Sequence, residues 1–159
     1  MKAKTLVFLL ACLIAVQILV PGYTIFRHYD TLTTGEGYKF IVRPYDPYDP
    51  FRGRYVSLRT EEMTYETYAV LGRDAKGYAS ILPASGDEKP ASGDYAKNLQ
   101  LSRYYMNERM APIAERIQFS MSDSDIMYLL VMVKAGHYVI EGLYLNGEPI
   151  EQYIVDGGL

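Results

Sequence analysis

Residues 126–147 read IMYLLVMVKAGHYVIEGLYLNG and carry the clearest structural pattern in the sequence. Ile126–Val133 is a continuous apolar run of strand length, which predicts a central strand. Lys134-Ala135-Gly136 then turns the chain into a second apolar segment, His137–Leu145. Asn146-Gly147 is the strongest hairpin signal of the chain, because both residues tolerate the positive φ that a two-residue turn requires. We therefore expect an antiparallel unit here, with Glu148–Ile154 following it as a short edge strand.

The preceding segments extend this pattern toward the N-terminus. Residues 73–77 form a hairpin signal, and residues 83–97, rich in Pro, Ser, Gly and Asp, predict a loop. Asn107 is a candidate cap for one short helix near 108–117, with Pro112 in its first turn if the helix begins later. Further strands are predicted where apolar residues alternate or cluster, at residues 38–43, 54–59, 68–71, 78–82 and 99–106.

The N-terminal segment is apolar enough to enter a membrane. Thr5–Val20 contains Gln17 as its only strongly polar side chain, and sixteen helical residues span about 24 Å of a roughly 30 Å hydrocarbon core. Continuing through Pro21 to Phe26 brings the helix to spanning length. Helical spacing persists beyond that point, so we predict one helix to Thr34, bent near Pro21 and ended by Gly35.

This segment has three possible interpretations. A retained signal anchor places Lys2 and Lys4 in the cytoplasm and the remainder outside, following the positive-inside rule. A cleaved signal peptide requires small residues that Val20-Pro21-Gly22 provides only in part. A lipoprotein would use Cys12, but apolar residues continue past it. We favour the anchor.

The combined pattern predicts a mainly β, α+β protein. Residues 1–34 are the transmembrane anchor and juxtamembrane helix, and residues 35–159 form an extracytoplasmic domain, in the periplasm or outside the cell. That domain is expected to be a small antiparallel β sandwich or barrel-like structure with one short helix. Its predicted core consists of Phe40, Val42, Val56, Leu58, Val70, Ile81, Leu129, Val131 and Val133.

Composition excludes several classes of function. Removing Lys2 and Lys4 from the sixteen basic residues leaves fourteen against nineteen acidic ones, a net charge of −5 for the domain. A nucleic-acid partner is therefore not expected, because phosphate binding requires clustered Lys and Arg. With Cys12 as the only thiol and two histidines, no disulfide, metal centre or cofactor is predicted. The sixteen tyrosines fit half-buried strands and interaction surfaces.

The densest chemistry lies in residues 43–59, RPYDPYDPFRGRYVSLR, with four arginines and two aspartates. In one interpretation Asp46 and Asp49 accept hydrogen bonds from arginines such as Arg54 and clamp the turn. In the other, spare arginines bind an anion or a partner's carboxylate, and Arg52 is the best candidate because it lies outside the strand alternation. The candidate binding residues are Arg43, Asp46, Asp49, Arg52, Gly53, Arg54, Tyr55, Leu58 and Arg59.

An enzymatic function is the alternative class. Ser57 with Lys39 or Lys134 supplies the residue types of a Ser/Lys hydrolase. His28 and His137 are interpreted as structural or exposed. The sequence has no G-x-S-x-G motif, and we predict no catalytic residues.

The sequence resembles the GDYXXLXY proteins over nearly its whole length. The name-giving motif matches at Gly53, Tyr55 and Leu58, whereas Arg54 replaces its Asp and Thr60 its final Tyr. The resemblance implies a membrane-anchored protein of the bacterial envelope with a polytopic membrane partner, and it implies no reaction. A binding or accessory subunit is the expected function. The wider resemblance rests on Gly35, Arg43-Pro44, Asp46-Pro47, Phe51-Arg52, Gly77-Tyr78, Arg103-Tyr104-Tyr105, Glu115 and Gly142-Leu143-Tyr144.

Overall fold

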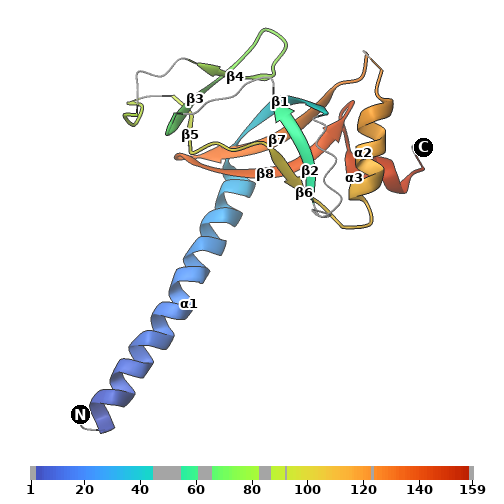
Figure 1. Ribbon diagram of the computed structural model, residues 1–159. Coiled ribbons are helices and arrows are strands. Elements are labelled where there is room, and N and C mark those ends of the chain that lie inside the picture. Colours follow the sequence, from blue (N-terminus) through green and yellow to red (C-terminus); the bar gives the residue numbers. More distant parts are fainter. Residues whose placement is uncertain are drawn as a thin grey trace.

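The computed structural model describes residues 3–44, 55–60, 66–82, 87–91, 93–122 and 124–157. A long helix, α1 (Ala3–Thr34), stands clear of a β-rich domain, as Figure 1 shows. Residues 7–34 have a mean hydropathy of 2.1 in their most apolar window, and that window is 0% buried. The helix is therefore long and apolar enough to cross a membrane, as predicted. It continues through Pro21 without interruption.

The domain is built on antiparallel strands, which confirms the predicted mainly β class. Among the described residues a six-stranded sheet has the order β6-β2-β1-β7-β8-β9, and a three-stranded sheet has the order β4-β3-β5. Both sheets are open. The strands are β1 (Glu36–Pro44), β2 (Tyr55–Thr60), β3 (Tyr68–Arg73), β4 (Ala79–Leu82), β5 (Tyr95–Lys97), β6 (Arg103–Tyr105), β7 (Met127–Lys134), β8 (His137–Leu145) and β9 (Glu148–Pro149).

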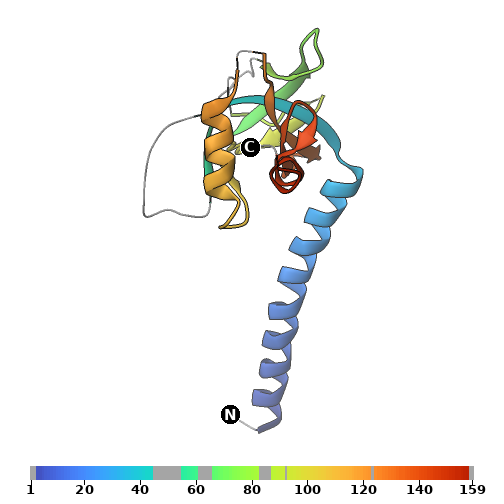
Figure 2. The same cartoon turned by 90° about the vertical axis from the view of Figure 1, so that its right-hand side faces the viewer.

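The predicted central hairpin is the middle of the large sheet. β7 pairs with β1 on one side and with β8 on the other, with a bulge opposite Leu130/Val131. One face of this sheet carries Phe40, Leu129 and Leu143, each at most 1% exposed. α2 (Ala111–Ser120), α3 (Ile150–Val155) and the small sheet contribute to the same core cluster. Figures 1 and 2 show α2 and α3 far from the free end of α1.

Most predicted core residues are confirmed. Phe40, Val42, Leu58, Leu129, Val131 and Val133 are buried, and Ile81 is half-buried against the core. The prediction for Val70 was wrong: Ala69 and Leu71 point inward, and Val70 is half-buried. Tyr-Ala-Val-Leu is apolar on both faces of the strand, so alternation could not choose the inward side. The side chain of Val56 lies outside the described residues.

The end of the chain differs from the predicted edge strand. Only Glu148–Pro149 pairs with β8, and Ile150–Val155 is a second short helix rather than a strand. Pro149 has no N–H to continue the ladder. Ile150, Tyr153 and Ile154 are spaced as one helical face and pack on the core. The prediction of one short helix in the domain was therefore incomplete.

Two predicted boundaries also change. The strand expected at 99–106 is limited to Arg103–Tyr105. Leu99 and Leu101 are buried in the core but belong to no strand. The loop expected at 83–97 contains β5, which pairs with β3. α2 begins at Ala111 with Pro112 in its first turn, the later start that the sequence allowed. Asn107 holds the preceding turn through a 2.9 Å hydrogen bond from the Arg109 backbone N–H to its Oδ1.

α1 ends at Gly35 for a steric reason. The Gly35 N–H donates to the Thr31 carbonyl (2.9 Å), and a Cβ at this position would collide with that carbonyl and lie 3.1 Å from the Val133 carbonyl. Gly35 is not among the glycines with positive φ. The glycine therefore marks the predicted helix end, but it provides space for close packing rather than a left-handed cap.

We predict that Gly35→Ala lowers the free energy of unfolding by about 1–3 kcal/mol, the usual cost of overpacking a close contact. Gly22→Ala is the control, because a Cβ there meets nothing within 4 Å. Urea denaturation of the full chain in detergent measures both. Equal unfolding midpoints for the two variants would contradict the packing role of Gly35.

Candidate functional site

The predicted Arg43–Arg59 segment connects two paired strands. Arg43 and Arg59 are Cα partners in the β1–β2 ladder, and Arg43 is exposed. Leu58 is 3% exposed and belongs to the core, so its role is packing. Tyr55 lies on β2 opposite Tyr105. The remaining candidates, Asp46, Asp49, Arg52, Gly53 and Arg54, lie outside the described residues, as do the side chains of Tyr55 and Arg59.

The three groups considered for a hydrolase are on separate strands. Ser57 is on β2 with Arg103 as its Cα partner, and its side chain is not described. Lys39 is on β1 and lies over the ring of Tyr128. Lys134, at the end of β7, is bound to Asp30.

A group that sequence reasoning missed is a row of three tyrosines. The rings of Tyr128 and Tyr144 are stacked, with centroids 5.3 Å apart and planes within 4°. Tyr78 adds a third ring, 6.4 Å from Tyr128. We call Tyr78, Tyr128 and Tyr144 the tyrosine row. The Lys39 ammonium lies 5.2 Å from the Tyr128 ring centre, within cation–π range.

Local backbone features make room for this row. Tyr78 follows Gly77, which has φ +85° in the β3–β4 turn. A Cβ on Gly142 would lie 3.1 Å from the Tyr144 ring, so the glycine allows that ring to cover its own strand. Burial raises the pKa of Tyr128, and the neighbouring Tyr78 raises it further. Burial also raises the pKa of Tyr144, and the charge of Glu141 adds to that effect. Both hydroxyls are therefore neutral at physiological pH. The abundance of tyrosine was the only signal of this row in the sequence.

The junction between α1 and the sheet is a second polar cluster. The Lys134 ammonium donates to both carboxylate oxygens of Asp30, at 2.8 Å each, and to the Thr34 hydroxyl at 2.7 Å. Thr31, between them on the helix, is 1% exposed. The junction therefore ties α1 to the end of the β7–β8 hairpin through charge-assisted hydrogen bonds and packing.

Two histidines lie at the same junction. The rings of His28 and His137 are 6.2 Å apart, edge to face. Burial lowers the pKa of His137, and the charges of Arg27 and His28 lower it further. The Nε2 of His137 is buried without a hydrogen-bond partner in the described structure. Within the described residues no three His, Cys, Asp or Glu side chains gather in a way that could hold a metal ion.

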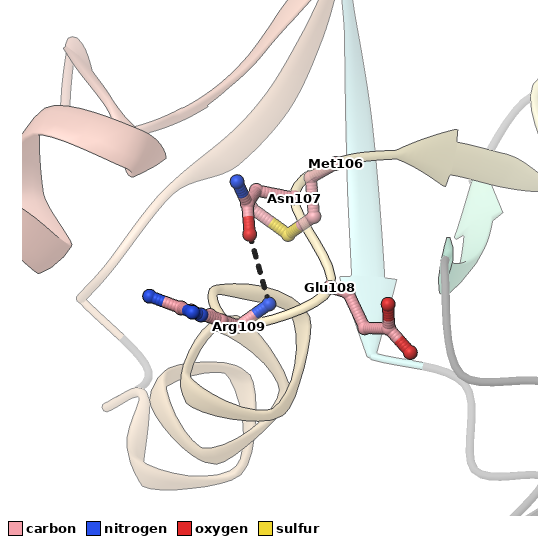
Figure 3. A pocket seen from close by; sticks show the side chains of 4 residues that line it. All are labelled: Met106, Asn107, Glu108 and Arg109. Atoms are coloured by element: carbon pink, nitrogen blue, oxygen red, sulfur yellow. Dashed lines mark hydrogen bonds between the residues drawn. The ribbon is translucent and has the colours of Figure 1, made fainter.

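An open hollow lies between β6 and α2. Four consecutive residues line it, Met106, Asn107, Glu108 and Arg109, as Figure 3 shows. The charged ends of Glu108 and Arg109 point away from one another. These four side chains include no serine, threonine, cysteine, lysine or histidine.

Comparison with known families identifies the class of the protein. The family model described as GDYXXLXY protein matches residues 17–143, which is most of the chain. The chain belongs to the GDYXXLXY family. Comparisons with curated proteins and with solved structures gave no match. Tyr78, Gly142 and Tyr144, on which the resemblance partly rests, all contribute to the tyrosine row.

Proposed function

We propose that the chain is a single-pass membrane protein whose domain acts outside the cytoplasm as a binding or accessory subunit of a polytopic membrane protein. One geometric relation carries the proposal: Tyr128 lies on the same face of β7 as Lys134, the residue that binds α1. Side chains two residues apart on a strand share a face. Lys134 and Tyr128 are six residues apart on β7, and Lys134 binds α1. Tyr128 and its ladder partner Tyr144 therefore face the side of the sheet to which α1 is bound.

The length of α1 supports a position close to the bilayer. Thr5–Phe26 is 22 residues, about 33 Å of helix, which matches a hydrocarbon core of roughly 30 Å. Arg27 is the first charged residue beyond this stretch, and Asp30 follows only about 5 Å further along the axis. Because Asp30 already contacts the sheet, the domain sits at the headgroup layer without a stalk.

The half-buried Tyr78 and Tyr144, together with the exposed Lys39, suit contact with the outer loops of a membrane protein, whereas Tyr128 is only 7% exposed. Tyrosine combines a large apolar ring with a hydrogen-bonding tip, and it is enriched at protein and membrane interfaces. Lys39 adds a cation that can bind a carboxylate or a backbone carbonyl of the partner. The domain as a whole is acidic, so this cation favours one defined region of a partner over general binding to anions.

We predict that Lys39→Glu reduces co-purification of an integral membrane partner in mild detergent several-fold, because it reverses the charge beside the row. Lys97→Glu is the matched control. Lys97 is also an exposed lysine over a tyrosine ring, 5.9 Å from the centre of Tyr68, but it belongs to the small sheet. Absence of any stoichiometric membrane partner, or an equal loss with both variants, would contradict the proposal.

The Arg43–Arg59 segment is proposed as a second binding element, with Arg52 contacting the partner and Arg54 clamping the turn. We predict that Arg54→Ala lowers the unfolding temperature, because it releases a loop carboxylate. Arg52→Ala is expected to leave that temperature nearly unchanged while weakening co-purification. Equal destabilisation by both changes would identify the segment as scaffold only.

The orientation is proposed from Lys2 and Lys4, which precede the apolar segment. We predict that a Lys76→Cys variant, made in a Cys12→Ala background, reacts with a membrane-impermeant thiol reagent in sealed right-side-out vesicles. Lys76 is exposed in the β3–β4 turn, so folding does not protect it. Labelling only after the vesicles are opened would reverse the proposed topology.

A further inference from the structure

Polar side chains within α1 repeat on one face of the helix. Gln17, Thr24 and Thr31 are each seven residues apart, which is nearly two full turns, so they lie almost in line. His28, four residues after Thr24, joins the same face. Thr31 is the member of this line that is buried against the domain. The line of polar side chains therefore runs from the place where β7 and β8 contact α1 toward the N-terminus of the helix.

Gln17 lies deep in the apolar segment. It is about 18 Å along the axis from Thr5, close to the midplane of a core of roughly 30 Å. Its amide has two donor hydrogens and an acceptor oxygen, and the apolar part of α1 packs on no other part of the described chain. The Thr24 hydroxyl donates to the Val20 carbonyl (3.0 Å), so the Thr24 hydroxyl oxygen can still accept a hydrogen bond from another group. Polar groups at this depth are costly to leave facing lipid.

The domain restricts what can pack on this face. β7 and β8 fill the space beside Thr31, where Lys134 and His137 reach α1. Figure 2 shows the domain displaced to one side of the axis of α1, whereas in the view of Figure 1 it extends to both sides of that axis. A second copy aligned along this face would bring its own residues 28–34 into the space that β7 and β8 occupy. A helix that ends at the membrane surface meets no such obstacle.

The end of this helix face that lies nearest the domain carries hydrogen-bond donors. Arg27 and His28 are exposed there. The carboxyl end of a helix carries unpaired carbonyl groups and the negative end of the helix dipole. A transmembrane helix that ends beneath the β7–β8 turn would place those carbonyl groups beside Arg27.

We propose that the Gln17–Thr24–His28 face of α1 binds one transmembrane helix of the polytopic partner, a helix that ends beneath the β7–β8 turn and carries a hydrogen-bonding side chain at the depth of Gln17. This inference rests on the proposed function and specifies which part of the anchor recognises the partner. Interhelical hydrogen bonds of side-chain amides and hydroxyls are a known source of helix association in membranes.

Photo-crosslinking in native membranes tests the face directly. A photoreactive residue is placed at Gln17 or Thr24, and at Ala15 or Phe26 as controls. Each control lies two residues from its test position, at similar depth and about 200° around the helix. We expect a protein adduct from positions 17 and 24 and none from 15 and 26. Equal adducts on both faces, lipid adducts alone, or an adduct of twice the mass of this chain would overturn the proposal.

Co-purification separates this inference from the proposed function. Gln17→Leu should lower recovery of the partner by about threefold to tenfold, as loss of one interhelical hydrogen bond predicts, whereas Ala15→Leu should not. If the wild-type chain recovers no integral membrane protein, both proposals fail. If the partner is recovered equally with Gln17→Leu, the helix proposal alone fails.

Discussion

The close contact between the end of α1 and the backbone of β7 sets the position of the rest of the molecule. Gly35 fits between the Thr31 carbonyl and Val133 only because it has no Cβ. Lys134 then holds Asp30 and Thr34 beside the same turn. A helix fixed at its last two turns cannot swing independently of the sheet. In the proposed membrane-anchored arrangement, the direction of α1 therefore also determines which face of the domain is turned toward the membrane.

The fold could be predicted from the sequence where one signal was dominant. Ile126–Leu145 formed the expected antiparallel pair because its apolar runs and turn agree. Prediction failed where local and tertiary preferences differ. The apolar spacing in Ile150–Val155 fits a strand or a helix, and Pro149 with the core contact of Ile150 decides for the helix. β5 has only three residues and depends on its partner β3, so composition alone indicated a loop there.

The candidate site was predictable only in part. The density of arginine and proline predicted a binding segment at residues 43–59, and the β1–β2 ladder pairs the two ends of that segment through Arg43 and Arg59. The tyrosine row was not predictable, since Tyr78 and Tyr144 are 66 positions apart in the sequence and meet only across Tyr128. Such a cluster depends on strand order and register, which single-sequence patterns do not contain.

We infer from these contacts that α1 and the domain move as one unit. Distance measurement between two spin labels tests it, with Ile25→Cys on the exposed side of α1 and Lys76→Cys in the β3–β4 turn, in a Cys12→Ala background reconstituted in bilayers. We predict one narrow distance distribution, which broadens when Asp30 and Lys134 are both replaced by alanine. A broad distribution with the junction intact would show that the domain moves freely relative to α1 and would contradict a rigid connection between them.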